Sequence, residues 1–208
     1  MTRGRFITLE GGEGTGKTTQ LTLLAAALSK RGLVVRETRE PGGSPRGEQL
    51  RRLLLTGSAD WSPRAETLLH FAARTEHVVI TIEPALTAGD WVVCDRFYDS
   101  TVAYQGYGQG ADRAFIAEQI RLLAADPDLT LVLDVPPDVA LQRMRRRGGD
   151  PDRYERLGAA FHARVRQGFR EIAAAAPNRC VLLDASGDAQ SVHAAIMTAV
   201  WSRLFPDQ

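Results

Sequence analysis

The stretch FITLEGGEGTGKTT, residues 6–19, decides the fold. Residues 6–9 form an apolar run that predicts a buried strand, residues 11–18 match the pattern G-x-x-x-x-G-K-[ST], and a helical pattern begins at Thr18. A glycine-rich loop between a strand and a helix lets backbone N–H groups surround phosphate oxygens, and the helix N-terminus adds a positive dipole. The stretch therefore predicts a phosphate-binding loop at the start of an α/β protein.

The loop residues have separate expected roles in binding a nucleotide. We expect Lys17 to lie against the β and γ phosphates, Thr18 to ligate Mg²⁺ through its hydroxyl and Thr19 to contact the α phosphate. Lys17 is one of only 2 lysines beside 24 arginines, so a flexible point charge stands where phosphate binding needs one. The predicted phosphate-binding set is Gly11, Gly12, Glu13, Gly14, Thr15, Gly16, Lys17, Thr18 and Thr19.

Short apolar runs alternate along the chain with longer segments of helical periodicity. The predicted strands are residues 6–9, 33–36, 91–94, 129–133 and 181–183. The predicted helices are residues 18–30, 47–55, 64–88, 113–125, 137–147, 154–176 and 189–204. This alternation predicts an α/β fold with a five-stranded parallel sheet, in a single domain over residues 1–208. We expect mobile segments near residues 40–47 and 146–156, where glycine, proline and charge cluster.

Composition excludes several classes of protein. The formal charge of +1 argues against bulk binding of nucleic acid or anionic membranes. No apolar run reaches the 18 or more residues that a membrane span needs, and the run before Gly11 is too short for a signal peptide, so we expect a cytoplasmic location. Cys94 and Cys180 lie in apolar runs without metal-ligand spacing, which favours reduced core cysteines.

The residues that end the third predicted strand help to distinguish between classes of nucleotide-binding protein. The chain has no N-K-x-D tetrapeptide, which a GTPase needs to read guanine, and the strand ends in Asp95-Arg96 instead of an acidic pair. Asp95 lies where a second metal-facing carboxylate belongs, at the carboxyl end of a parallel strand. Arg96 directly after it suggests an anionic acceptor beside the metal, with a capping or surface role as the alternative.

Segments that follow the other strands supply cations, aromatic rings and amide or hydroxyl groups. They are residues 38–43, 70–74 and 99–106. Together they offer what is needed to hold a nucleotide by its phosphate, ring and base edge.

With these segments in place, the chain resembles bacterial thymidylate kinases, within the P-loop nucleoside monophosphate kinases, nearly from end to end. The resemblance rests on FITLEGGEGTGKTTQ, TREPGGSPRGEQLR, FAAR, DRFYDSTVAYQGYG and an arginine-rich lid segment. It implies a three-layer P-loop kinase fold, transfer of the ATP γ-phosphate to dTMP in dTTP biosynthesis, dependence on Mg²⁺ and a homodimer. ATP and dTMP are the implied substrates, and the loop set above becomes the implied ATP-binding set.

The resemblance also implies roles for acceptor-side residues. Arg96 and Arg74 would hold dTMP near its phosphate and its base, with Arg39 and Arg51 as further phosphate-side cations. Glu13 would lie near the 3'-hydroxyl, Tyr104 would crowd the 2' position, and Thr101 and Gln105 would reach the polar edge of thymine. Three of these have plainer interpretations: Arg51 as a solvated helix residue, Glu13 as a solvent-facing loop residue and Tyr104 as core.

One position departs from the family pattern. Four residues before Arg74 the family usually has an aromatic residue that stacks on thymine, and here that position is His70, with Phe71 next to it. We prefer His70 for the stacking role because residues four apart share a helix face. Phe71, which is the alternative, would then be core.

The segment RMRRRGGDPDRYER, residues 143–156, contains six arginines and a glycine-rich break. It could be a solvated face, but a cationic hinge there suits a lid, over roughly residues 146–156, that balances phosphoryl charge. In the family, the residue at the position of Gly14 is arginine in one subgroup and non-basic in another, where the lid supplies the cation, and this chain resembles the second. The resemblance favours Arg153 as the catalytic lid arginine, followed by Arg147.

The acceptor is already an anionic phosphate oxygen, so we expect catalysis by Lys17, Mg²⁺, Arg96 and the lid without a general base. Two alternatives remain open: a kinase for another monophosphate such as dUMP or dGMP, and a nucleotide-binding switch without transfer activity. Residues 184–187, after the last predicted strand, are a candidate for adenine contact by fold analogy.

Overall fold

The computed structural model describes residues 2–56, 60–148 and 152–205 and contains a parallel sheet in the order β2-β3-β1-β4-β5. The strands are β1 (Phe6–Glu10), β2 (Val35–Arg39), β3 (Trp91–Asp95), β4 (Leu129–Asp134) and β5 (Cys180–Asp184). All neighbouring pairs are parallel, so the carboxyl ends of the strands meet at one edge of the sheet. The predicted α/β fold with a five-stranded parallel sheet is confirmed.

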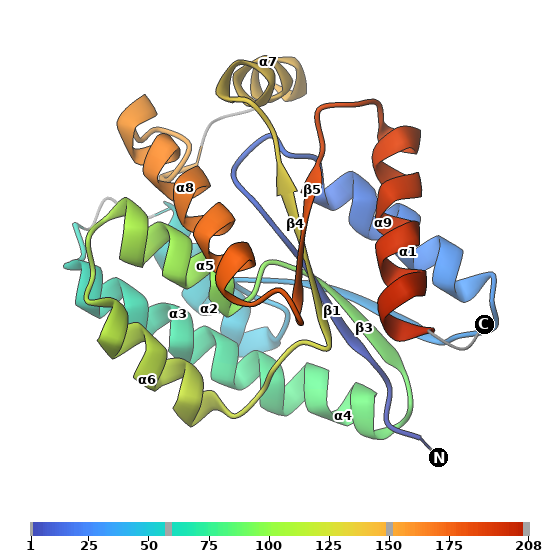
Figure 1. Ribbon diagram of the computed structural model, residues 1–208. Helices are drawn as coiled ribbons and strands as arrows, with labels where there is room; N and C mark the ends of the chain where they lie inside the picture. The colour runs from blue at the N-terminus through green and yellow to red at the C-terminus, as the bar shows by residue number, and fades with distance from the viewer. Residues whose placement is uncertain (1, 57–59, 149–151, 206–208) are drawn as a thin grey trace.

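Helices cover both faces of this sheet, which gives the three layers expected of the fold (Figure 1). One face is covered by α1 (Lys17–Ser29) and α9 (Ala189–Leu204). The opposite face is covered by α3 (Pro63–His77), π-helical η1 (Val78–Ile82), α4 (Glu83–Thr87), α5 (Tyr98–Thr101), π-helical η2 (Val102–Gly108), α6 (Arg113–Leu123) and α8 (Ala159–Ala175). The remaining helices are α2 (Pro45–Thr56), which packs against α3, and α7 (Pro137–Arg147).

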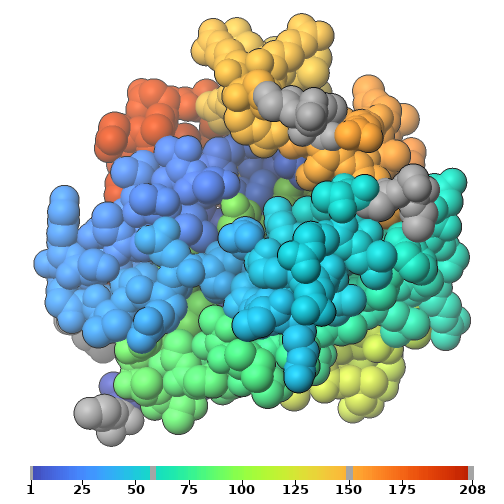
Figure 2. Space-filling model, turned by 180° about the vertical axis from the view of Figure 1, so that it is seen from behind, coloured from blue at the N-terminus to red at the C-terminus, as the bar shows by residue number. Residues whose placement is uncertain are grey.

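The core forms on both sides of the sheet because the inner strands are apolar on both faces. Every residue of β1 is buried, and β4 is buried from Leu129 to Leu133. Ile7 and Leu9 pack toward Leu24 and Leu28 of α1, whereas Phe6 packs on the other side. These central strands end at the same edge of the sheet, where α7 stands out from the rest of the molecule in the reverse view (Figure 2).

Some predicted boundaries were wrong. The strand predicted at 33–36 is β2 at 35–39, because the polar residues Glu37 to Arg39 pair with β3 at the edge of the sheet. The helix predicted from Tyr154 begins at Ala159, since Tyr154 and Glu155 lie in a turn whose N–H groups donate to Asp152 Oδ1. Residues 98–108, for which no helix was predicted, form α5 and η2.

The predicted lid extends over residues 149–151, which lie outside the described residues, and mobility there or at residues 40–47 stays a prediction. A single domain over residues 1–208 also stays a prediction. Within the described ranges, no helix is both long enough and apolar enough to cross a membrane.

Candidate functional site

A cavity of about 700 Å³ opens at the carboxyl ends of the strands, between the phosphate loop and helices α3, α5 and α7. Most of the predicted site residues line it: Glu13, Gly14, Thr15, Gly16, Lys17, Thr18, Thr19, Arg39, Arg51, His70, Arg74, Asp95, Arg96, Thr101, Tyr104, Gln105 and Arg147. Gly11, Gly12, Phe71 and Arg153 are outside its lining. The structure therefore brings together both the phosphate loop and the predicted acceptor residues in one continuous space.

The phosphate loop turns sharply between β1 and α1. Gly11 and Gly14 have φ angles of 137° and 71°, in the region that favours glycine. A Cβ on Gly11 would lie 2.4 Å from the Leu133 carbonyl oxygen, and one on Gly14 would lie 2.5 Å from the Ala140 carbonyl oxygen. Glycine at these positions lets the loop pass close to β4 and α7, and it leaves no room for a basic side chain at position 14.

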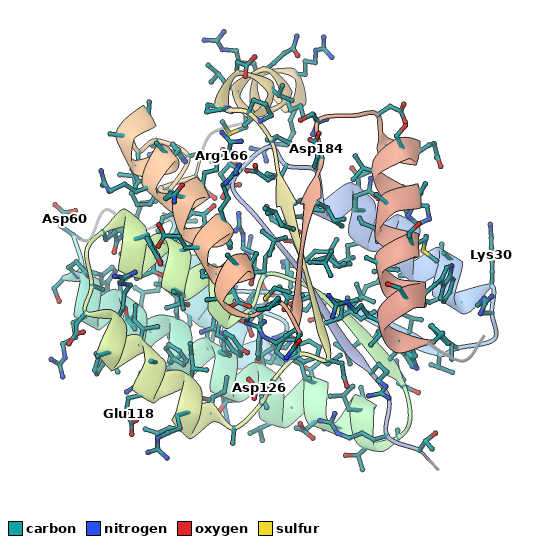
Figure 3. All side chains as sticks on the ribbon, in the orientation of Figure 1. Lys30, Asp60, Glu118, Asp126, Arg166 and Asp184 are labelled. Atoms are coloured by element: carbon teal, nitrogen blue, oxygen red, sulfur yellow. The ribbon has the colours of Figure 1, made fainter. Side chains whose placement is uncertain are left out.

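Lys17 begins α1 and folds back into the loop. Its Nζ donates to the carbonyl oxygens of Gly11 and Gly12 at 3.1 and 2.7 Å and to Thr15 Oγ1 at 3.3 Å. Burial, together with the nearby positive charge of Arg96, lowers the pKa of Lys17 to about 8. A polyphosphate placed against this ammonium would stabilise its charged form. The other lysine, Lys30, lies at the far end of α1 and points outward (Figure 3).

The two predicted metal ligands lie together. Thr18 Oγ1 donates to Asp95 Oδ2 at 3.0 Å. The other carboxylate oxygen, Asp95 Oδ1, is buried and has no hydrogen-bond partner within the described part of the chain. A buried carboxylate oxygen without a partner, beside a hydroxyl, fits a cation that prefers oxygen ligands, such as Mg²⁺.

Arg96 lines the cavity and contacts both the phosphate loop and residues of the predicted acceptor side. Its Nη1 donates to the Gly11 carbonyl oxygen at 2.9 Å and to Ser100 Oγ at 3.1 Å. Its Nη2 donates to Glu13 Oε1 at 2.6 Å and to the Tyr104 hydroxyl at 3.0 Å. Burial alone would raise the pKa of Glu13, but Arg96 and then Lys17 lower it to about 2. The Arg96–Glu13 pair is therefore ionised at neutral pH.

Glu10 positions the turn that presents Arg96. The backbone of Arg96 has a φ of 72°, which is unusual for a residue with a side chain. Glu10 Oε1 accepts a hydrogen bond from the Phe97 N–H at 2.7 Å, and Oε2 accepts one from Ser100 Oγ at 2.6 Å. Sequence analysis did not single out Glu10, although an acidic residue that ends an apolar, buried strand is a recognisable signal.

Arg74 lies at the inner end of the cavity, with only 2% of its surface exposed. Its Nε donates to Glu40 Oε2 at 2.7 Å, and its Nη2 donates to the Phe97 carbonyl oxygen and to Thr101 Oγ1, both at 3.1 Å. Its Nη1 is buried and has no partner among the described residues. The guanidinium is thus held by three hydrogen bonds, while one buried donor group is left without a partner among the described residues.

His70 and Phe71 differ in their surroundings. His70 lines the cavity, and its Nε2 lies 2.9 Å from the Tyr154 hydroxyl oxygen. Burial and the positive charge of Arg74 lower the pKa of His70 to about 3, so its ring is neutral. Phe71 packs in the core with Phe97, and the Arg74 guanidinium carbon lies 4.8 Å from the centre of its ring. Of the two rings, only that of His70 can face a ligand here.

Two arginines stand at the rim. Arg39 Nη2 donates to both carboxylate oxygens of Glu48 at 3.1 Å, and Arg51 Nη1 donates to the Pro41 carbonyl oxygen at 2.8 Å. Burial, together with the charge of Arg39, lowers the pKa of Arg51 below its usual value. Both side chains line the cavity, so Arg51 is more than a solvated helix residue.

The arginines of the predicted lid separate into different environments. Arg147 ends α7, lines the cavity and pairs with Glu155. Arg153 instead pairs with Glu66, away from the phosphate loop. Arg143 donates to the carbonyl oxygens of Ala185 and Gly187, both at 2.9 Å, and so holds the loop that was predicted to contact adenine.

Several polar residues that line or support the cavity received no individual role from the sequence: Glu10, Glu40, Glu66 and Tyr154, which are buried, and Ser100 and Arg143, which are half-buried. Glu40 links Arg74 to His77, whose Nδ1 lies 3.0 Å from Glu40 Oε1. Glu66 is fully buried in α3. An acidic residue on the same face as His70 and Arg74 is the only sequence signal that could have indicated it.

Comparison with known proteins gives a consistent result. The family described as Thymidylate kinase matches residues 9–196. The chain is 52% identical to the thymidylate kinase of Gluconobacter oxydans over 97% of this chain and 96% of that protein. It is 51% identical to that of Caulobacter vibrioides, over 98% and 99% of the respective chains. The crystal structure of thymidylate kinase from Ehrlichia chaffeensis superposes with a TM-score of 0.76 at 36% identity, over 95% of this chain and 99% of that one.

Proposed function

The chain belongs to the thymidylate kinase family, whose activity is the phosphorylation of thymidylate with ATP, and we propose that its cavity transfers the γ-phosphate of ATP to dTMP, giving dTDP and ADP. One observation carries this proposal. The cavity joins the phosphate loop with Lys17 to the buried donor of Arg74, and Arg96 lies between them. A donor polyphosphate and an acceptor monophosphate can therefore meet at one cation.

On the donor side, residues 11–19 hold the ATP phosphates, with Lys17 against the β and γ groups. Thr18 and Asp95 would hold Mg²⁺, which would neutralise phosphate charge and help to orient the leaving group. The unpartnered Asp95 oxygen and its 3.0 Å contact with Thr18 support this assignment. Arg143, which holds the loop after β5, positions that loop for adenine.

On the acceptor side, Arg74, Thr101 and Gln105 face the base edge, and the neutral ring of His70 packs on the base. Arg39 and Arg51 attract the monophosphate at the rim. Arg96 holds the same phosphate where it meets the γ-phosphate. The ionised Glu13 also accepts a hydrogen bond from the Tyr104 hydroxyl at 2.8 Å. This bond holds both side chains in place on the side of the cavity where the sugar would bind.

Transfer requires no general base in this arrangement. The attacking oxygen belongs to a phosphate that is already anionic, so the protein aligns the two groups and balances the charge that develops between them. Lys17 and Arg96 supply that charge from the fixed part of the site. Position 14 has no room for an arginine in this loop, so we expect a third cation from another segment.

We assign the third cation to Arg147. Arg147→Gln is expected to lower kcat about 30-fold with little change in KM for dTMP, because its charge acts on the transferring phosphoryl group. Arg153→Gln tests the competing assignment; because Arg153 pairs with Glu66 outside the cavity lining, this variant should keep kcat within about threefold. Steady-state kinetics of both variants test the assignment. A larger loss of kcat in the Arg153 variant would reverse it.

The proposed function is tested by an ADP-release assay with a panel of monophosphates. Turnover with dTMP, ATP and Mg²⁺ is expected, and chelation of Mg²⁺ should abolish it. Preferential turnover of another monophosphate would favour the alternative kinase. ATP binding by folded protein without turnover of any monophosphate would favour a nucleotide-binding switch.

A homodimer and a cytoplasmic location complete the proposal. The second copy is supported by large apolar side chains left exposed on the α3–η1 run, at Leu68, Val79 and Ile80. An exposed apolar surface of this kind is typical of protein interfaces. Sedimentation equilibrium measures the mass of the particle, and substitution of Val79 and Ile80 by serine should shift it toward the monomer.

A further inference from the structure

Glu66 is a buried carboxylate that the transfer reaction itself does not use. Its Oε1 accepts hydrogen bonds from Gln105 Nε2 at 2.8 Å, Gln109 Nε2 at 2.7 Å and the Tyr154 hydroxyl at 2.7 Å, and its Oε2 accepts one from Arg153. Burial would raise the pKa of Glu66, but these hydrogen bonds, that of Tyr154 first, lower it. An ionised carboxylate can only accept hydrogen bonds, so Glu66 dictates that every neighbour donates.

This requirement fixes the orientation of the Gln105 amide. Nε2 has two hydrogens, and both are used: one on Glu66 Oε1 at 2.8 Å and one on the Tyr154 hydroxyl oxygen at 3.1 Å. The flipped amide would place its oxygen against the carboxylate, which is repulsive. Gln105 lines the cavity, and its Oε1 accepts no hydrogen bond from the described residues. The amide therefore offers a ligand an acceptor and not a donor.

The same logic applies to Tyr154. Its single hydroxyl hydrogen goes to Glu66, so its oxygen must accept the bonds from Gln105 and His70. His70 must then carry its hydrogen on Nε2, which leaves Nδ1 as an acceptor. Tyr154 is held in place by an edge-to-face contact with Tyr104, at 5.4 Å between ring centres.

We propose that Glu66 and Tyr154 are positioning residues: they determine which groups of the acceptor pocket donate hydrogen bonds and which accept them. In this way they select pyrimidine bases that carry a hydrogen on N3. This proposal rests on the proposed function, since it concerns the base of the same acceptor. Thymine and uracil present a carbonyl oxygen next to an N3 hydrogen, which matches the Arg74 donor and the Gln105 acceptor. Cytosine presents an amino group and a bare N3, so each contact is reversed.

Two substitutions test the positioning roles of Glu66 and Tyr154. Glu66→Gln places an amide where only an acceptor stood, so Gln105 can turn over and offer its NH₂ group to cytosine. Tyr154→Phe removes the acceptor for one Gln105 hydrogen while its ring stays packed on Tyr104. Tyr107→Phe is the matched control, because the Tyr107 hydroxyl donates to Glu171 at the surface, at 2.7 Å.

The readout is the ratio of affinities for dTMP and dCMP, measured by calorimetry without ATP, together with kcat/KM for each. In the unaltered protein a ratio near 10⁴ is expected, because a pocket built for one hydrogen-bond pattern rejects the reversed one. The ratio should fall about tenfold in Tyr154→Phe and about a hundredfold in Glu66→Gln, with ATP affinity unchanged. Tyr107→Phe should keep the original ratio.

Other outcomes separate the two proposals. An unchanged dTMP-to-dCMP ratio in folded Tyr154→Phe, or an equal change in Tyr107→Phe, overturns the positioning role. If Glu66→Gln fails to fold, Tyr154→Phe alone decides. Selective dTMP binding without turnover by the unaltered protein would contradict the proposed transfer while leaving the positioning role standing.

Discussion

Lys17→Ala is expected to lower kcat about a thousandfold while the protein stays folded. Lys17 is the cation at the closed end of the phosphate loop, and its Nζ lies within 3.3 Å of three oxygen atoms of that loop. Removing it leaves the β and γ phosphates without their nearest protein charge. Single-turnover kinetics with saturating ATP and dTMP measure the effect on the chemical step.

Lys30→Ala is the matched control for this prediction. It removes the other lysine of the chain, which is exposed at the opposite end of α1, and should leave kcat unchanged. Circular dichroism of both variants checks that the helical content of the protein is unchanged. Turnover of Lys17→Ala within tenfold of the unaltered protein would contradict the role assigned to this residue.

Arg96→Ala is expected to lower kcat/KM for dTMP between about a hundredfold and a thousandfold. Its guanidinium makes four hydrogen bonds that link the phosphate loop, Glu13, Ser100 and Tyr104. Arg96→Lys should recover little of the loss, because an ammonium cannot reproduce the planar fork of donors. The comparison of the two variants separates the geometry of the guanidinium from its charge.

The control for Arg96 is Arg121→Ala on α6, which breaks only an exposed pair with Glu118 and should leave kcat/KM unchanged. Glu118 lies on the side of the molecule away from the ends of the strands (Figure 3). Because Arg96→Ala also leaves the half-buried Glu13 without its arginine partner, a lower melting temperature is expected as well. Full activity of Arg96→Lys would show that a point charge is sufficient.

Much of the fold was predictable because its signals are local. The apolar runs of β1, β3 and β4 are buried strands, and the glycine-rich pattern lies between β1 and α1 as predicted. The edge strand β2 was misplaced because three of its five residues are polar and exposed, so its position follows from pairing with β3 and not from its own composition. Residues 98–108 have no helical pattern of their own, yet they pack as α5 and η2 against α8.

The sequence by itself determined the phosphate loop, the places of most strands and helices along the chain, and the residue types offered to a nucleotide. Each of these depends on neighbouring residues. Only the tertiary structure decided how those residues are oriented. Phe71 lies in the core while His70 faces the cavity, and Arg153 pairs with Glu66 while Arg147 remains beside the phosphate loop. The hydrogen-bond donors to Glu66 are residues 105, 109, 153 and 154, which are distant from it in the sequence. A carboxylate can fix the orientation only of groups that folding brings within hydrogen-bond distance.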